Sequence, residues 1–389
     1  MSIRRVCLIA FAVASAAAGG VAPADRVQSA DLFVRAAHWL DPVSGELHGP
    51  VLVQITDGRI AQIAAPGAVT IAPSASLRDL GDVTLVPGLI DAHVHLGIGG
   101  RPDANAQADL RAGFTTVVDL GARTDAILRL RDRINRGEID GPRILAAGKW
   151  IGKQNGICEF GDIGVPGGAD AYRARVRENI DAGADLIKVC VSTWTADAFN
   201  KPDAYEIDDA ALAATVDEAH RSKRLTLAHA ISIGSVKAAL AAHVDGFAHA
   251  AYVDEPTAAV LRARNVFMIP TLASLAGDGD DPPSVALRSA VRTAHMAGVR
   301  IVFGTDGGVL PHGENAKEFA ALSKAGVPPL DAIRAATINA AAAFGLGEEI
   351  GQIKAGYAAD LIAVSGNPLQ DLESLRRVRF VMRRGRLVQ

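Results

Sequence analysis

Six side chains that can bind a metal ion or carry a proton stand in or directly after short apolar runs. His93 and His95 end the run "LVPGLIDAHVHL", where a strand would point both imidazoles to one face. Four more follow at wide intervals: Lys188 in "DLIKVCV", His229 in "LTLAHA", His249 in "FAHA" and Asp306 in "GTD". Polar side chains among apolar neighbours are costly unless they are paired. We therefore expect the six to meet in one metal site.

The ligand types favour zinc or a similar divalent ion, which imidazole and carboxylate groups bind well. Lys188 is the unusual member of the set. A buried ammonium group beside metal cations has a lowered pKa, so the neutral amine dominates. That amine can react with carbon dioxide, and the resulting carbamate is an anion with two oxygens that can bridge two metals. We predict two divalent ions, with zinc favoured, and a carbamate on Lys188.

The segment 87–346 has the pattern of eight strand–helix units. In each unit an apolar run precedes an amphipathic stretch, as "DLIKVCV" precedes "IDDAALAATVDEAHRSK". This alternation indicates a parallel sheet. Eight units in roughly 250 residues are the size of a (β/α)8 TIM barrel, which keeps its chemistry at the carboxyl ends of its strands. The predicted fold class is therefore α/β, with the six side chains at one mouth of the barrel.

Both chain ends are β-rich and bracket this segment. Residues 25–86 contain alternating runs such as "VLVQITDGRIAQIA", with "DG" as a hairpin signal, and residues 347–389 continue in the same style. We predict that the two ends form one small β-sandwich domain beside the barrel.

Residues 1–24 have the order of a secretory signal peptide. Arg4 and Arg5 precede an apolar run, and small residues follow. The run is short for a membrane span, and a buried N-terminal helix is the alternative. We expect a mature protein that is periplasmic or secreted and not bound to a membrane.

Forty basic and 43 acidic residues nearly cancel, which is untypical of a nucleic-acid partner. A small-molecule substrate is expected instead, and a homo-oligomer is left open. Beyond residue 24 the cysteines are Cys158 and Cys190. Two small buried hydrophobic residues are the favoured interpretation, and a single disulfide in an oxidising compartment is the alternative.

The other histidines are weighed separately. His312 follows Asp306 in the last predicted loop, where substrate binding and a structural hydrogen bond are equally favoured. The rest are expected to have no catalytic role, either at helix ends or in the β-rich flank: His220, His243, His295, His38 and His48.

The motifs "PGLIDAHVHL", "DLIKV", "LTLAHA", "FAHA" and "GTDGG" resemble the amidohydrolase superfamily, and within it the imidazolonepropionase-like and prolidase-like (Xaa-Pro dipeptidase-like) group. The resemblance covers nearly the whole chain after residue 24. It implies a buried metal ion on His93, His95 and Asp306, a bridging carbamate on Lys188, and a more exposed metal ion on His229 and His249.

The resemblance also implies the reaction. A metal-bridging hydroxide would cleave an amide C–N bond of a small substrate, either a dipeptide such as Xaa-Pro or an N-acyl amino acid, with Asp306 as general base and then acid. The alternatives are a cyclic-amide hydrolase or deaminase with one metal, a Schiff-base aldolase that uses Lys188, and a non-catalytic exported binding protein.

Two departures from the group leave the substrate open. The loop "GKWIGKQNGICEFG" has no histidine where the group has one, and "HAISIGSV" lacks the tyrosine that several dipeptidases carry. Residues in or near the predicted loops that could hold a carboxylate or a ring are Arg101, Lys153, Trp194 and Tyr252.

Overall fold

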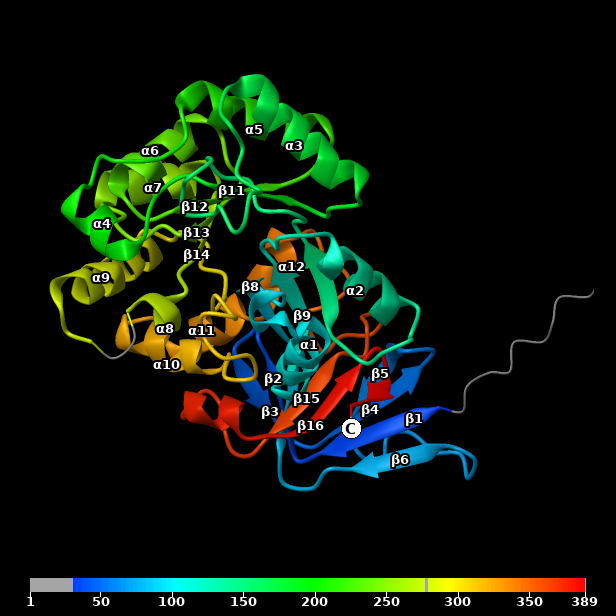
Figure 1. Cartoon of the computed structure of the whole chain (residues 1–389). Helices are drawn as coiled ribbons and strands as arrows, with labels where there is room; N and C mark the ends of the chain where they lie inside the picture. Colours follow the sequence, from blue (N-terminus) through cyan, green and yellow to red (C-terminus); the bar gives the residue numbers. More distant parts are fainter. Residues whose placement is uncertain (1–30, 277–278, 389) are drawn as a thin grey trace, which may run out of the picture.

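The computed structural model describes residues 31–276 and 279–388. The predicted signal peptide therefore lies outside the described residues. Figure 1 shows one part of the molecule in which helices pack around parallel strands, and a second, β-rich part beside it. Among the helices of the described ranges, none is long and apolar enough to cross a membrane.

The parallel strands form where the sequence predicts them, because each is a short apolar run. Among these parallel strands, every residue is buried in Leu89–Val94, in Phe114–Asp119 and in Thr226–Ala230, which carries His229. This is expected for strands that are covered on both faces. They form a three-stranded and a four-stranded sheet: β8 (Leu89–Val94), β9 (Phe114–Asp119) and β10 (Arg143–Ala146); then β11 (Ile187–Cys190), β12 (Thr226–Ala230), β13 (Gly246–His249) and β14 (Phe267–Ile269).

The predicted eighth strand does not form as a regular strand, so the prediction of a closed ring of eight strands is corrected. Residues 301–307 instead make isolated bridges, at Ile301 to β14 and at Gly307 to β8. The backbone amide of Thr305 donates to the Asp91 carboxylate at 3.1 Å rather than to a neighbouring strand. Between β10 and β11, Ile151 likewise makes an isolated bridge to Val189.

The helices follow the strands in the predicted alternation, with one interruption. After residue 328, Thr337 adopts a non-helical backbone (φ −131°, ψ −98°) and separates α11 from α12. The helices are α1 (Pro102–Arg111), α2 (Ala126–Asn135), α3 (Ala169–Asp181), α4 (Thr195–Asn200), α5 (Asp209–Arg221), α6 (Ile233–Ala241), α7 (Glu255–Ala263), α8 (Leu272–Leu275), α9 (Pro282–Met296), α10 (Lys317–Lys324), α11 (Pro329–Ala335) and α12 (Ile338–Ala343), with short 3-10 turns at Ile98–Gly100 and Leu372–Arg376.

Side chains at helix starts help to fix these boundaries. The Asp208 carboxylate accepts a hydrogen bond from the amide of Ala211, and Ser232 accepts one from Ser235 in the same way. Such N-caps satisfy amide groups that have no partner within the helix. They set where α5 and α6 begin, and so where the loops after β11 and β12 end.

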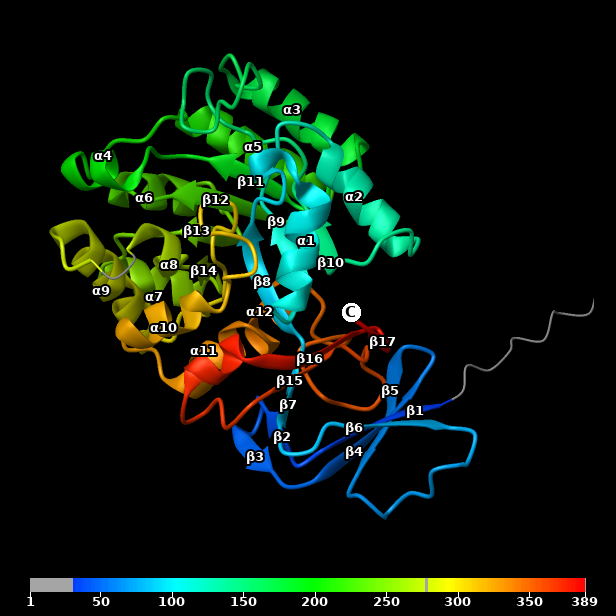
Figure 2. The same ribbon diagram turned by 60° about the horizontal axis from the view of Figure 1, so that its bottom comes forward.

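The β-rich part consists of two sheets that combine both ends of the chain (Figure 2). One has the order β5-β4-β1-β6 and the other β17-β16-β15-β7-β2-β3. Val53 from the first sheet and Leu361 from the second belong to one buried apolar cluster. Its separation as a β-sandwich domain stays a prediction. The strands are β1 (Leu32–Ala36), β2 (His38–Asp41), β3 (Glu46–His48), β4 (Val51–Thr56), β5 (Arg59–Ala64), β6 (Ser76–Asp79), β7 (Thr84–Pro87), β15 (Leu361–Val364), β16 (Val378–Arg383) and β17 (Arg386–Leu387).

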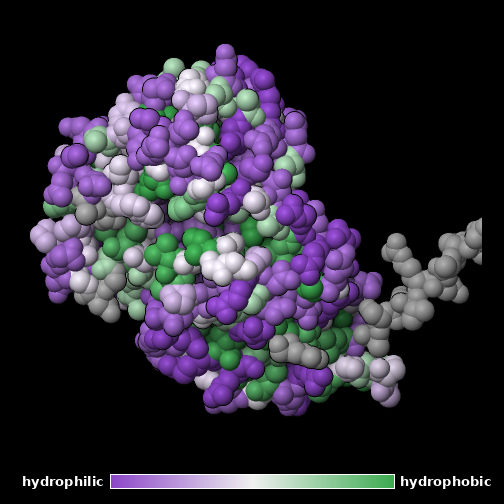
Figure 3. All heavy atoms as spheres, viewed as in Figure 1, coloured by the Kyte–Doolittle hydropathy of each residue, from purple (hydrophilic) through white to green (hydrophobic). Residues whose placement is uncertain are grey.

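The outer surface is mostly hydrophilic on the face seen in Figure 3, with hydrophobic residues gathered along a hollow near its middle. This agrees with a molecule whose large apolar side chains are mainly buried in its core.

Candidate metal centre

The structure brings the six predicted polar side chains together. All are buried, and all line one pocket of about 440 Å³, measured out to its open mouth. They are His93, His95, Lys188, His229, His249 and Asp306. The histidines lie at or near the carboxyl ends of parallel strands, which meet at one edge. Lys188 lies within β11, and Asp306 lies in the irregular segment that bridges β14 and β8.

Three of these side chains point ligand atoms at a common position. The Nε2 atoms of His93 and His95 lie 3.2 Å apart, and each lies 3.3 Å from Oδ1 of Asp306. Two ligand atoms bound tetrahedrally to one zinc ion at about 2.0–2.1 Å would stand about 3.3 Å apart. The three separations therefore fit a single cation shared by the three side chains.

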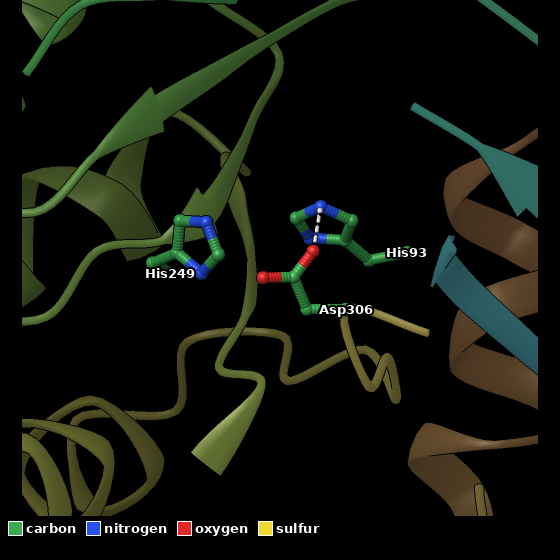
Figure 4. Close-up of side chains that lie close together, drawn as sticks. All are labelled: His93, His249 and Asp306. Carbon is green, nitrogen blue, oxygen red and sulfur yellow. Dashed lines mark ion pairs between the residues drawn. The ribbon is translucent and has the colours of Figure 1, made fainter. Parts of the chain in front are cut away.

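A second grouping overlaps the first. His93, His249 and Asp306 offer ligand atoms that all lie within 4.8 Å of one another. Figure 4 shows the Asp306 carboxylate between the two imidazole rings. The ring of His229 lies 4.6 Å from that of His249, centroid to centroid, so the grouping continues toward a fourth histidine.

Neighbouring atoms fix how two of the rings are presented. Nδ1 of His95 lies 3.0 Å from the carbonyl oxygen of Gly121, so a proton on Nδ1 leaves Nε2 free to bind a metal. Nδ1 of His249 lies 2.7 Å from the hydroxyl of Thr271 in the same way. By contrast, Nδ1 of His93 and Nε2 of His229 are buried without a hydrogen-bond partner among the described residues. Unsatisfied buried nitrogens are costly, and a metal ion would satisfy His229 Nε2 directly.

The backbone is strained at the same place. His249 (φ 81°), Thr271 (φ 51°) and Asp306 (φ 58°) are non-glycine residues in the left-handed region. Such conformations persist only where the surroundings enforce them, and they cluster at functional sites. The chain also passes close to β8 here, because a Cβ at Gly304 would lie 3.0 Å from the backbone nitrogen of His93.

Burial controls the charges in the pocket. It lowers the pKa of Lys188 to about 7 and the pKa of His249 to about 3, and it holds the pKa of His93 well below its usual value. Burial alone would raise the pKa of Asp306, but the neighbouring His93 and His95 lower it well below its ordinary range. The site thus favours neutral imidazoles, an amine that is partly deprotonated near neutral pH and an ionised carboxylate, which are the forms that bind metals.

Asp91 supports this arrangement and was missed in the sequence. Its buried carboxylate accepts hydrogen bonds from the amide of His93 at 3.1 Å, from both the amide and the hydroxyl of Thr305, and from Asn315. It therefore ties β8 to the segment that carries Asp306. Burial raises its pKa to about 7. Its position two residues before His93, on the same face of β8, is the signal that could have identified it.

Asp119 and Glu318 were also missed. Asp119 ends β9, and its buried carboxylate accepts hydrogen bonds from the amides of Leu96 and Gly121. Burial raises its pKa to about 6. Glu318 accepts hydrogen bonds from the amides of Leu272 and Ala273, directly after the Thr271 that contacts His249. The position of Asp119 at a strand end was a usable signal, whereas nothing in the sequence around Glu318 points to this contact.

His312 lies beside the site but does not line the pocket. Its Nδ1 lies 2.9 Å from the buried Asp109 carboxylate and its Nε2 lies 3.4 Å from the backbone oxygen of His95. Burial opposes protonation of His312, but the hydrogen bond and the charge of Asp109, together with the His95 carbonyl and the Asp91 charge, outweigh burial and raise the pKa. This geometry agrees with the structural alternative, and substrate binding by His312 stays a prediction.

Cys158 and Cys190 form a disulfide, with Cα atoms 6.2 Å apart, which corrects the favoured interpretation of two free buried cysteines. The physical reason is that the loop after β10 folds back over the pocket and brings Cys158 to the end of β11. The bridge thereby ties this loop to the strand that carries Lys188.

The remaining predicted residues fall in two groups. Trp194 lines the pocket, whereas Arg101, Lys153 and Tyr252 do not. His220 and His295 pair with carboxylates of Asp245 and Asp331 near helix ends, at 2.9 and 3.1 Å. His243 follows α6, and His38 and His48 lie in the β-rich part, each outside the pocket.

The amidohydrolase family model matches residues 84–388, a span that includes every side chain of the centre. The chain belongs to the amidohydrolase family. An ochratoxinase from Aspergillus niger is 28% identical over 356 residues, which cover 76% of this chain and 73% of that protein. The crystal structure of the A. niger ochratoxinase has a TM-score of 0.80 at 25% identity, over 92% of this chain and 95% of that chain.

Solved structures of a dipeptidase and of a prolidase are also similar to this amidohydrolase. A Xaa-Pro dipeptidase with methionine bound in its active site has a TM-score of 0.83 at 28% identity, over 92% of this chain and 99% of that chain. A prolidase in complex with N-methylphosphonate-L-proline has a TM-score of 0.80 at 28% identity, with the same coverage.

Proposed function

We propose that this amidohydrolase is a binuclear metal-dependent enzyme that hydrolyses the amide C–N bond of a small substrate, either a dipeptide such as Xaa-Pro or an N-acyl amino acid. The observation that carries the proposal is the convergence of His93, His95 and Asp306 at mutual distances of 3.2 to 3.3 Å, in a pocket that also holds Lys188, His229 and His249. The ochratoxinase and prolidase relatives support the choice of amide substrates.

The donor atoms indicate which residues would hold the ions. His93, His95 and Asp306 would hold one, His229 and His249 the other, and a carbamate on Lys188 would bridge them. Bound divalent ions would polarise the scissile carbonyl group and make water acidic enough to act as a nucleophile near neutral pH. The pKa of Lys188 near 7 supports the carbamate, because only the neutral amine reacts with carbon dioxide.

Asp306 is the proposed proton carrier. Its carboxylate is ionised and faces the pocket between His93 and His249. In the proposed reaction it accepts a proton from the attacking water and then delivers it to the leaving nitrogen. Its amide donates to the backbone oxygen of His93 at 2.8 Å, so its main chain holds it beside β8 while the proton moves.

The same contacts argue against a Schiff-base aldolase. Such an enzyme would need Lys188 alone as the nucleophile and would leave the histidines of the pocket without a purpose. Borohydride trapping with a carbonyl substrate should therefore leave Lys188 unmodified.

The proposed location is periplasmic or secreted. It is supported by the signal-like residues 1–24 and by the disulfide, because such bridges persist in oxidising compartments. Detection of the mature protein in the periplasmic or culture fraction of an expressing cell would test it.

The activity itself is tested with a library of Xaa-Pro dipeptides and N-acyl amino acids. We expect zinc-reconstituted protein to hydrolyse at least one of the two classes and chelator-treated protein to hydrolyse neither. The proposal would be overturned if fully metal-loaded protein cleaved no amide in either class.

A further inference from the structure

The pocket has a second, apolar half that the proposed metal ligands do not use. Besides the six polar side chains and the two cysteines, its lining consists of Ile98, Trp150, Ile157, Phe160, Trp194 and Val309. We propose that this half is a subsite for an aromatic ring carried by the substrate next to the scissile amide bond. The inference rests on the proposed amide hydrolysis and narrows its substrate class.

Aromatic rings border the polar centre at two of its histidines. The ring of Trp150 lies 5.4 Å from that of His95, and the ring of Trp194 lies 6.0 Å from that of His229, centroid to centroid. Phe160 extends the first of these surfaces, with its ring 4.4 Å from that of Trp150. A group attached to an amide that is held at the centre would therefore lie close to one of these rings. Aromatic side chains favour offset or edge contacts with other rings at such distances.

The apolar residues at the mouth are exposed although the core is well packed. Ile98 and Phe160 are each 36% exposed, Trp194 is 49% and Val309 is 51%. Exposed apolar side chains that gather around one concave pocket are typical of a ligand site. Covering them would remove apolar surface from water, and an aromatic ring does this better than a methyl group.

The lining offers little else for recognition. Among the described residues that line the pocket, Lys188 is the only cation, and the proposed function assigns it to the metal centre. Contacts with the rings are therefore the main means by which side chains of this pocket can distinguish substrates.

The loop that carries Trp150 and Phe160 is held in place before a substrate binds. The backbone oxygen of Trp150 accepts a hydrogen bond from Arg175 at 3.2 Å, and the amide of Ile157 donates to Glu206 at 3.0 Å. The Cys158–Cys190 disulfide fixes the same loop to β11. A subsite that is already formed loses little conformational entropy when it binds a ligand.

Two matched substrate pairs test the proposal with zinc-loaded protein. N-Benzoylglycine is compared with N-acetylglycine, and N-acetylphenylalanine with N-acetylalanine. The first member of each pair carries an aromatic ring, on the acyl side of the amide in the first pair and on the amine side in the second. We expect at least one pair to show a kcat/KM ratio of about tenfold or more in favour of the ring. Trp194→Ala and Phe160→Ala should each reduce that ratio at least about fivefold. Phe199→Ala is the matched control, because Phe199 is an exposed ring of α4 that does not line the pocket.

A binding measurement separates this proposal from the proposed function. Ligand-observed NMR with metal-free protein compares N-methylbenzamide and N-methylacetamide as probes. We expect tighter binding of N-methylbenzamide, weakened in Trp194→Ala and unchanged in Phe199→Ala. If amides are cleaved without any ring preference in either pair or in binding, the subsite is wrong while the hydrolase stands. If ring-selective binding is found but no amide is cleaved, the subsite stands while the proposed function fails.

Discussion

His93 and Asp306 are joined twice, once through their side chains and once through the backbone. Nε2 of His93 lies 3.3 Å from Oδ1 of Asp306, and the amide of Asp306 donates to the backbone oxygen of His93 at 2.8 Å. The backbone contact holds Asp306 at the edge of β8, and the side-chain contact directs its carboxylate into the pocket. This double connection supports the two roles proposed for Asp306, as a metal ligand and as a proton carrier.

Replacement of Asp306 by Asn should strongly reduce turnover while the fold is retained. The amide keeps the size of the side chain but cannot accept the proton, so we expect kcat to fall about 10²- to 10⁴-fold. Steady-state kinetics of zinc-loaded Asp306→Asn, with circular dichroism to confirm folding, are the measurement. Activity close to that of wild type would contradict the assigned role.

Asp91 is a positioning residue whose loss should act through its neighbours. Asp91→Ala removes the acceptor for the amides of His93 and Thr305, which frees the segment that carries Asp306. We expect kcat and zinc affinity to fall by about 10- to 100-fold, as for other groups that orient metal ligands. Asp82→Ala, at a highly exposed carboxylate of the β-rich part, is the control. A purely structural role would lower the melting temperature and leave the zinc affinity of the folded fraction unchanged.

The disulfide between Cys158 and Cys190 should stabilise the folded protein. The bridge joins residues 32 positions apart and so lowers the conformational entropy of the unfolded chain. This raises the free energy of unfolding by roughly 3–4 kcal/mol. We expect the Cys158→Ser, Cys190→Ser double variant to unfold at lower urea concentration than the oxidised wild type. Wild-type protein unfolded in the presence of reductant should match the double variant. Identical midpoints for oxidised and reduced protein would show that the bridge contributes nothing.

Glu318 should make stability depend on pH. Burial raises its pKa from 4.5 to about 8, so the folded protein binds its proton over a range in which the unfolded chain has lost it. The free energy of unfolding contributed by this group therefore falls as the pH rises from about 4.5 to about 8. In Glu318→Gln this dependence is absent, so the stability of the variant relative to wild type should improve between pH 5 and pH 9. Urea unfolding at several pH values measures it, with Glu314→Gln, at an exposed position, as the control. A relative stability that is constant with pH would contradict the raised pKa.

The parts of the site that the sequence predicts are those that depend on local pattern. His229 and His249 each end an apolar run, and the period of a strand together with the parallel arrangement is enough to bring such residues to one edge. The strands and most helices follow for the same reason, because their buried faces are continuous in the sequence.

The parts that it does not predict depend on contacts between distant segments. The backbone from 301 to 307 does not form a regular strand, and at Thr305 its amide and hydroxyl bond the side chain of Asp91, a contact that the apolar run "VRIVFGTD" does not reveal. The disulfide depends on the path of the loop over the pocket, and sequence spacing does not determine that path. Asp91 could have been identified from its place two residues before His93, but its contacts with Thr305 and Asn315 join distant segments and cannot be read from that place.

The central claim is that the six side chains hold two divalent ions, and metal analysis of purified protein after zinc reconstitution and desalting tests it most directly. We predict a content close to two zinc ions per chain in wild type and a lower content in Lys188→Ala, partly restored by propionate, with an exposed-lysine variant, Lys237→Ala, equal to wild type. A wild-type content of one ion or fewer per chain, or an unchanged content in Lys188→Ala, would contradict the account.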